Sequence, residues 1–295
     1  MARRSSAAAA GVAACVAAAV AATLVVSGCS LFGPTIALPK DLAEAAAKPE
    51  IGSRALLRAN QGELEVATWQ LMVQSLVDAL GNGLDPQRAQ PLKAAVHRTY
   101  GTQRLFDRAA TSLAEDWDSD AALAQLSFLA SGTGQKVLRA RALRRDQKTA
   151  ARFREFSSDF SESRFPAARV ELLRRLDRAT LTSKSAVLVN RAVVDGALAA
   201  LTGTSSGTDQ AAFRSLRERA AREEPQLYPV AAQELLRWNL FALDSLSDDE
   251  LARYVTFSES SAGQWWVVSS ARALRLAANG AGEELFQALR ARDEL

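Results

Sequence analysis

One short segment of the chain matches the pattern of a serine nucleophile. Gly203-Thr204-Ser205-Ser206-Gly207 has the G-x-S-x-G spacing that, in one class of hydrolases, exposes a serine on a strained turn between a strand and a helix. Here the preceding segment, DGALAALT, has a helical pattern, and the only histidine, His97, lies upstream, whereas that class needs its base downstream of the serine. We therefore predict a loop between two helices, rich in small polar residues.

Metal ligands and paired acids are equally sparse. A single histidine cannot form a histidine metal site, so we expect His97 on a helix face. The acidic residues gather in two clusters, Glu115-Asp116-Asp118-Asp120 and Asp248-Asp249-Glu250. A glycan-cleaving enzyme needs a carboxyl of raised pKa in a cleft, but we expect both clusters at helix starts, where negative charge stabilises the helix dipole. The sequence predicts no catalytic residue, no metal site and no cofactor.

The amino terminus carries a different chemistry. Arg3 and Arg4 precede a run from Ala7 to Val26 that is almost entirely Ala, Val, Leu and Gly, the pattern of a secretion signal. Val26-Ser27-Gly28-Cys29 follows and resembles the lipobox of bacterial lipoproteins, in which a peptidase cleaves before a cysteine that carries a diacylglycerol. We predict that residues 1–28 are a lipoprotein signal peptide, cleaved after Gly28, and that Cys29 is the lipid attachment site.

Two alternatives are an uncleaved transmembrane helix and an ordinary signal peptide with an incidental cysteine. Cys15 also follows small residues, but cleavage there would leave a short apolar run before it and a second one after it. Two or three palmitate-type acyl chains on one terminus hold a protein stably at a membrane. Ser30 follows the cysteine where an aspartate would, in enteric lipoproteins, indicate inner-membrane retention, so we expect the outer membrane of a Gram-negative bacterium, facing the periplasm.

The composition of the mature chain limits its partners and its core. Removing residues 1–28 takes away two arginines and no acidic residue, so the formal net charge falls from +3 to +1, which argues against nucleic acid as a partner. An acylated Cys29 leaves no thiol for a disulfide. Apolar residues make up 48% of the chain but aromatics only 6%, so we expect helices that approach closely through small residues such as alanine.

The pattern of the remaining chain is helical throughout. Residues 30–50 contain Pro34, Pro39 and Pro49 around a short helical turn at 41–48, so we predict a tether over 29–52. From Ser53 onward apolar residues recur at spacings of three and four, as in the stripe Trp69, Met72, Leu76 and Leu80, on a helix ending at Gly81-Asn82-Gly83. Further helix ends are indicated by Asp85-Pro86, Gly101, Asp118, Pro166, Thr208-Asp209 and a capping box of Ser247 with Glu250. We predict an all-α helical bundle.

The chain also contains an internal repeat. DAALAQLSFLASGTGQ (120–135) and DELARYVTFSESSAGQ (249–264) align at an offset of 129. The shared positions are Phe128, Ser131, Gly134 and Gln135 in the first copy and Phe257, Ser260, Gly263 and Gln264 in the second. Each copy predicts a helix that ends at an aromatic residue, a serine that breaks it, and a Gly-Gln pair that opens the next helix. The motif is either a packing corner or a repeated binding corner.

The pattern Phe-x-x-Ser-x-x-Gly-Gln after an acidic, apolar helix resembles the family called domain of unknown function 2059, found in secreted and periplasmic bacterial proteins. The family usually has proline after the serine, where this chain has Gly132 and Ser261. The resemblance implies two tandem helical repeats, over 53–155 and 163–293, and export from the cytoplasm. It implies no catalytic residue.

Two features suggest contact surfaces. Residues 136–154 carry eight cations, Lys136, Arg139, Arg141, Arg144, Arg145, Lys148, Arg152 and Arg154. They predict a basic helix that is either a solvated face or a site for anionic lipid headgroups. In the pair Trp265-Trp266 we expect one ring in the core and the other partly exposed, because adjacent helical positions point about 100° apart.

These patterns predict a membrane-anchored, periplasm-facing lipoprotein. Its non-enzymatic helical body is expected to bind a protein or a cell-envelope component in a groove between the repeats. The alternatives are an envelope-acting hydrolase or lyase with an acidic catalytic residue, and a carrier of apolar ligands. A deep cleft with one buried carboxyl favours the enzyme, and a large dry cavity favours the carrier.

Overall fold

The computed structural model describes residues 37–81, 86–205 and 207–293, and this part of the chain is all-α, as the sequence predicts. The helices are α2 (Leu42–Ala47), α3 (Pro49–Ala59), α4 (Gly62–Gly81), α5 (Pro86–Thr99), α6 (Thr102–Glu115), α7 (Ser119–Ala130), α8 (Gly132–Ala142), η1 (Leu143–Arg145), α9 (Gln147–Ser158), η2 (Glu162–Arg164), α10 (Ala167–Thr180), α11 (Thr182–Thr204), α12 (Gly207–Ala242), α13 (Asp248–Glu259) and α14 (Ser261–Asp293). The two η elements are short 3₁₀ helices.

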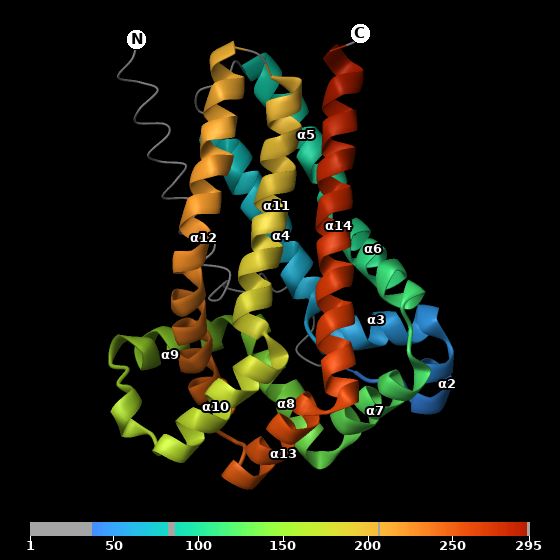
Figure 1. Ribbon diagram of the computed structural model, residues 1–295, viewed down its shortest axis with the longest axis vertical. Coiled ribbons are helices and arrows are strands. Elements are labelled where there is room, and N and C mark those ends of the chain that lie inside the picture. The colour runs from blue at the N-terminus through green and yellow to red at the C-terminus, as the bar shows by residue number, and fades with distance from the viewer. Residues whose placement is uncertain (1–36, 82–85, 206, 294–295) are drawn as a thin grey trace.

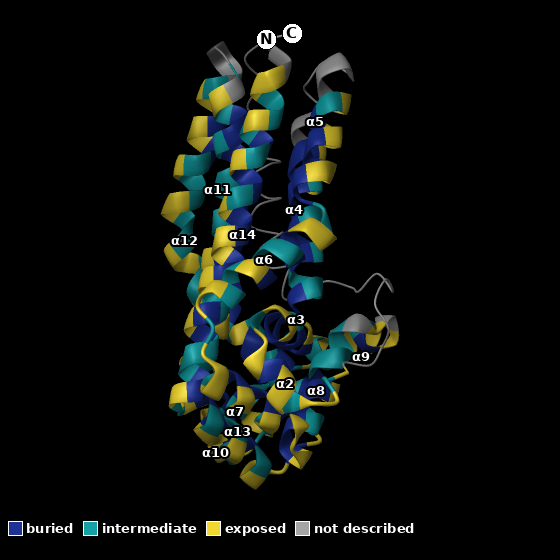
Figure 2. Cartoon of the chain, turned by 90° about the vertical axis from the view of Figure 1, so that its right-hand side faces the viewer, coloured by how far each residue is buried: buried dark blue, intermediate teal, exposed yellow. Residues whose placement is uncertain are grey.

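The helices form two groups along the long axis (Figure 1). The long-helix bundle comprises α4, α5, α6, α11, α14 and the first half of α12, and α11 packs along both α12 and α14. The base comprises the shorter helices α7, α8, α9, α10 and α13 with the end of α12. Buried residues line the inner faces of the long helices and exposed residues their outer faces (Figure 2).

The core of the long-helix bundle is shared by the two halves of the chain. Its buried residues come from positions 57–113 and 189–285, so the predicted repeats 53–155 and 163–293 do not have separate cores here. Trp69, Met72 and Leu76, which were predicted to share one face of a helix, are all buried in it. The side chain of Leu80 lies outside the described residues.

Small residues let α11 and α14 approach closely, as the alanine-rich composition predicts. A Cβ atom built on Gly282 would lie 2.7 Å from the Cα atom of Gly196. Ala197, Ala278 and Ala281 are fully buried around this crossing. Helix α11 is also long and apolar enough to cross a membrane by length and composition, but half of that stretch is buried inside the protein.

The predicted tether over 29–52 is wrong for its second part. Residues 42–52 belong to α2 and α3, and Ala45 and Ala46 are buried against α7. The indole N–H of Trp117 donates a hydrogen bond to the carbonyl oxygen of Ala46 (2.7 Å). The alanine-rich turn therefore packs on the body, because its small side chains allow a close approach.

The predicted helix starts at Asp118, Ser247 and Pro166 are confirmed, whereas α12 begins at Gly207, just before the predicted Thr208-Asp209, and Asp85 lies outside the described residues. Asp118 accepts a hydrogen bond from the N–H of Ala121 and so caps α7. Ser247 and Glu250 form the predicted capping box at the start of α13. Pro166 precedes α10 directly.

Candidate functional site

Each repeated motif forms a corner between two helices, α7 and α8 in the first and α13 and α14 in the second. The serine between the helices has nearly the same backbone conformation in both, with φ −64° and ψ 164° at Ser131 and φ −69° and ψ 164° at Ser260. The Oγ of Ser131 accepts a hydrogen bond from the N–H of Gly134 (3.1 Å), and the Oγ of Ser260 accepts one from Gly263 (3.3 Å). Both serines are N-caps.

The motif glycines pack on the end of the preceding helix. A Cβ atom built on Gly134 would collide with the carbonyl oxygen of Phe128, and one on Gly263 would collide with that of Phe257. No side chain fits at either position without moving backbone.

The motif glutamines tie each corner together. The side-chain amide of Gln135 donates to the carbonyl of Leu129 (3.0 Å), and that of Gln264 donates to the carbonyls of Ser258 (2.7 Å) and Ala179 (2.7 Å). The motif residues thus act in packing and capping, and none is placed as a catalytic group.

The two corners also contact each other. The rings of Phe128 and Phe257 stack with centroids 4.1 Å apart and planes 2° apart. Two further hydrogen bonds are equivalent to each other under the offset of 129, which relates Lys136 to Trp265 and Asp116 to Ser245. They join Lys136 Nζ to the Ser245 carbonyl (3.3 Å) and Trp265 Nε1 to the Asp116 carbonyl (3.4 Å).

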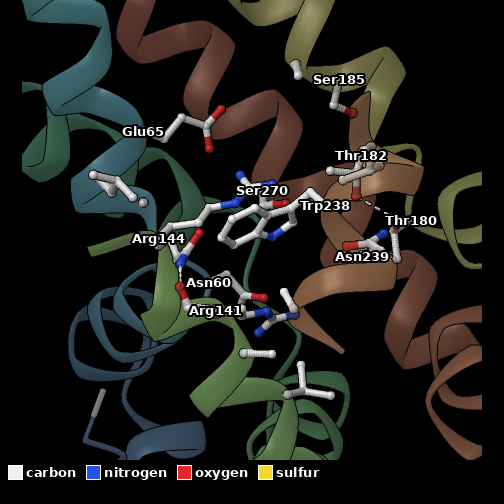
Figure 3. Close-up of a pocket in the computed structure, with 18 of the residues that line it drawn as sticks. Asn60, Glu65, Arg141, Arg144, Thr180, Thr182, Ser185, Trp238, Asn239 and Ser270 are labelled. Carbon is white, nitrogen blue, oxygen red and sulfur yellow. Dashed lines mark hydrogen bonds between the residues drawn. The ribbon is translucent and has the colours of Figure 1, made fainter. Parts of the chain in front are cut away.

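A cavity of about 320 Å³ lies where the long-helix bundle meets the base (Figure 3). Its walls come from α3, α4, α7, α8, η1 and α9 in the first half of the chain and from α10, α11, α12, α13 and α14 in the second. The second corner contributes Phe257 and Gly263 to the wall. Small-molecule sites occupy about 300–1,000 Å³, so the cavity has room for one small ligand.

Two opposite charges face each other in this cavity. The carboxylate of Glu65 on α4 and the guanidinium of Arg144 on η1 point toward one another (Figure 3). Both residues are half-buried, and both line the cavity. Burial raises the pKa of Glu65 from 4.5 to about 7, although the charge of Arg144 opposes this shift.

Arg144 has donors that no described residue uses. Its guanidinium lies 5.0 Å from the ring centroid of Trp238, and its side chain makes no hydrogen bond with a described residue. Burial lowers the pKa of Arg144 to about 10, with Glu65 opposing the shift, so the group stays charged at neutral pH. The neighbouring Arg141 is already engaged, since it donates to the Ala59 carbonyl (3.2 Å) and to the Tyr254 hydroxyl (3.1 Å).

Gln61 positions Glu65. Its backbone is in the left-handed region (φ 66°), which is unusual for a residue with a side chain. Its side-chain amide donates to the carbonyl of Arg141, and its own carbonyl accepts from the N–H of Glu65 (3.0 Å). The first turn of α4 is thereby fixed to the end of α8, with Glu65 directed into the cavity.

Two buried polar atoms among the lining residues have no partner. Trp69 is 0% exposed and Gln125 is 4% exposed, and neither Trp69 Nε1 nor Gln125 Oε1 makes a hydrogen bond. A buried polar atom without a partner costs about 1–3 kcal/mol. Neither atom is exposed to the open space of the cavity, although both residues contribute other atoms to its wall.

The expectation of one basic helix over 136–154 is wrong. The segment contains α8, η1 and α9, because Asp146 breaks it and caps α9 through the N–H groups of Lys148 and Thr149. Lys136 pairs with Glu250 (2.7 Å), which lowers the pKa of that carboxyl through a hydrogen bond. The other described cations of the segment 136–154 fall into two sets. Two of them, Arg141 and Arg144, line the cavity, and the rest are exposed on the surface: Arg139, Lys148, Arg152 and Arg154.

The tryptophan pair differs slightly from expectation, because both rings are half-buried. Trp265 packs edge-on against Trp117 with centroids 5.6 Å apart. Trp266 packs against the bundle core and lines the cavity. Both tryptophans therefore pack mainly against other residues of the protein and do not form an exposed contact surface.

The other candidates have structural roles. His97 is exposed in the last turn of α5. Gly203 and Thr204 end α11 and Gly207 begins α12, so the loop is shorter than predicted, and Ser206 lies outside the described residues. The first acidic cluster was expected at a helix start, but Glu115 ends α6 and Asp116 follows it and pairs with Arg272.

The sequence reasoning did not identify Glu65 or Arg144. Glu65 lies one turn before Trp69, on the face that also carries Met72, so a charge on an apolar stripe was the available signal. Arg144 gave no comparable signal, because it was one of many cations in its segment.

Cys29 and Gly28 lie outside the described residues, so the predicted lipid attachment and cleavage sites remain predictions. Within the described ranges, no three His, Cys, Asp or Glu residues are grouped in a way that could hold a metal ion. No family model matches the chain, and no curated protein or solved structure does. The resemblance to the domain of unknown function 2059 therefore also stays a prediction.

Proposed function

We propose that this chain is a lipid-anchored protein of the Gram-negative cell envelope whose helical body binds a small envelope component in the cavity. Cys29 would carry the lipid, and the body would face the periplasm, with the outer membrane as the favoured location. The protein acts as a binding protein in this proposal, without catalysis.

The cavity is the observation that carries the proposal. It is lined by helices from both halves of the chain, and an arginine whose side chain makes no hydrogen bond with a described residue faces it. Apolar residues such as Val189, Leu235 and Leu274 complete its lining. Mostly apolar walls with a few directed polar groups are typical of small-molecule sites. A purely apolar cargo fits less well, because it would leave the guanidinium of Arg144 without a hydrogen-bond acceptor.

We further propose that residues 53–155 and 163–293 are diverged copies of one unit. The matching serine caps, the stacked phenylalanines and the paired contacts at an offset of 129 support this proposal. The cavity would then lie between the copies, since Glu65 and Arg144 come from the first and Ser270 from the second.

A hydrolase or lyase is the second candidate, because Glu65 is a cavity carboxyl with a pKa of about 7. Glycoside hydrolysis commonly needs a second carboxylate. The other described carboxylate in the lining, Asp146, is engaged with the N–H groups and hydroxyl of α9, which lowers its pKa. A lyase needs only one such acid. If the protein is a lyase, the E65Q variant should still bind cell-wall glycan but should no longer cleave it.

Native mass spectrometry of the full protein, released gently from bacterial envelopes, tests the binding proposal. We expect a bound small molecule on the wild type. S270F places a ring in the cavity from α14 and should abolish this mass, whereas V268F adds the same ring at a position on α14 that is 63% exposed and should not. The proposal fails if the wild type carries no adduct or if S270F keeps it.

A further inference from the structure

We propose that the cavity binds a small organic carboxylate, which pairs with the guanidinium of Arg144, and that Glu65 takes up one proton from solvent when this anion binds. The inference rests on the proposed binding function and names the ligand class.

Arg144 is the group that recognises the anion. A guanidinium has five N–H donors in a planar fork that matches a carboxylate in a bidentate manner. No described residue accepts a hydrogen bond from the Arg144 side chain, which lines the cavity. Its guanidinium carbon lies 5.0 Å from the centroid of the Trp238 ring, a cation–π contact that uses none of the N–H donors.

The number of available charges favours a monoanion. Four charged residues line the cavity: Glu65 from α4, Arg141 from α8, Arg144 from η1 and Asp146 before α9. Arg141 and Asp146 are held by their own hydrogen bonds, which leaves one guanidinium for the ligand. From α13 the hydroxyl of Tyr254 accepts from Arg141, and the described lining residues of α3, α7, α10, α11, α12 and α14 are uncharged.

Part of the remaining lining is apolar and favours a ligand with an apolar body. Beyond Arg144, the indole of Trp238 and the side chains of Val189, Leu235 and Leu274 form apolar wall. These contacts would favour one or two rings or a short acyl chain attached to the carboxylate.

Binding of such an anion is coupled to Glu65 by repulsion. The Glu65 carboxylate points at the same guanidinium. In a partly desolvated site, ionising both Glu65 and the ligand carboxylate beside a single cation costs free energy. The pKa of Glu65 is already about 7 without an anion, and a second negative charge raises it further. The anion therefore binds the form of the protein in which Glu65 is protonated. In this form Glu65 is a hydrogen-bond donor, and the positive charge of Arg144 is balanced by the ligand alone.

Isothermal titration calorimetry of the full protein with 1-naphthylacetate and with its neutral amide, 1-naphthylacetamide, tests the inference. We expect tighter binding of the acid than of the amide at pH 6. The affinity for the acid should fall by about tenfold between pH 6 and pH 8, because ionised Glu65 must take up a proton there. Titrations in buffers of different ionisation enthalpy should show nearly one proton taken up per anion at pH 8.

Variants separate the two roles. E65Q should bind the acid without proton uptake and with a constant affinity from pH 6 to pH 8. R144M should lose the preference for the acid but keep binding the amide, and R144K, which keeps the charge without the fork, should retain part of the preference. R139Q, an exposed arginine on α8, is the matched control and should behave as the wild type. Circular dichroism checks that each variant is folded, and the pH series on the wild type needs no variant at all.

The outcomes are distinguishable. Equal affinities for acid and amide, or an acid affinity independent of pH in the wild type, would overturn the anion inference and leave the cavity as a binding site. Failure of both probes to bind would overturn the cavity site and the inference together.

Discussion

Phe128 and Phe257, which lie 129 residues apart, stack face to face with ring centroids 4.1 Å apart. They are equivalent residues of the two repeated motifs, so the contact joins α7 of one corner to α13 of the other. F128A and F257A should each destabilise the protein by about 1–3 kcal/mol. Urea unfolding of both single variants and the double variant should give a coupling energy of about 0.5–1.5 kcal/mol. Strict additivity would show that the stacked contact does not hold the corners together.

Replacing either of two glycines in the first motif by alanine should have very different effects on the stability of the protein. A Cβ atom on Gly134 would collide with the Phe128 carbonyl, whereas one on Gly132 would meet nothing within 4 Å. G134A should therefore lower the free energy of unfolding by about 2–4 kcal/mol, because α8 must move away from α7. G132A should change it by less than about 0.5 kcal/mol or stabilise slightly. Equal effects in urea unfolding would contradict this account of the corner.

The raised pKa of Glu65 predicts a specific dependence of stability on pH. The folded protein holds a proton on Glu65 up to about pH 7, whereas the unfolded chain releases it near 4.5. Between these values the native state binds more protons, so rising pH lowers the free energy of unfolding. E65Q lacks this loss and should become more stable than the wild type by about 1–3 kcal/mol at pH 8, with little difference at pH 4.

Denaturant unfolding of wild type and E65Q at pH 4, 6 and 8 measures this effect. E155Q, which changes an exposed glutamate on α9, is the control and should show a constant difference from the wild type. A difference between E65Q and wild type that does not grow with pH would show that Glu65 is not desolvated.

The lipid anchor is tested at Cys29. C29A should abolish acylation and, with it, cleavage after Gly28, so that a larger, unacylated form which keeps the apolar run Ala7–Val26 replaces the mature protein in the distribution of species. C15A should leave the distribution unchanged, since Cys15 lies within the predicted signal peptide. Mass spectrometry of the mature amino terminus gives the independent check. An unmodified residue 29 would refute the lipoprotein proposal.

Features with local causes could be predicted from the sequence. The caps at Asp118 and at Ser247 with Glu250 depend on residues three positions apart, so the segment itself determines them. The buried stripe of Trp69, Met72 and Leu76 follows from helical periodicity in the same way.

The cavity could not be predicted, because its key pair is created by tertiary packing. Glu65 and Arg144 are far apart in the chain and face the same cavity only because the folded chain brings Gln61, just before α4, to the carbonyl of Arg141 near the end of α8. The basic segment 136–154 was wrongly expected to be one helix. The arginines in it favour a continuous helix, but Asp146 caps a new one, and this effect is the stronger of the two. The alanine-rich turn before residue 50 showed no periodicity long enough to reveal which face packs on α7.

The most direct test of the central claim is a crystal structure of the protein purified from bacterial envelopes without refolding. We expect electron density for a small molecule in the cavity beside Arg144, with an acidic group within hydrogen-bond distance of the guanidinium. A cavity that holds only water, or one closed by direct contact of the Glu65 carboxylate with Arg144, would contradict it.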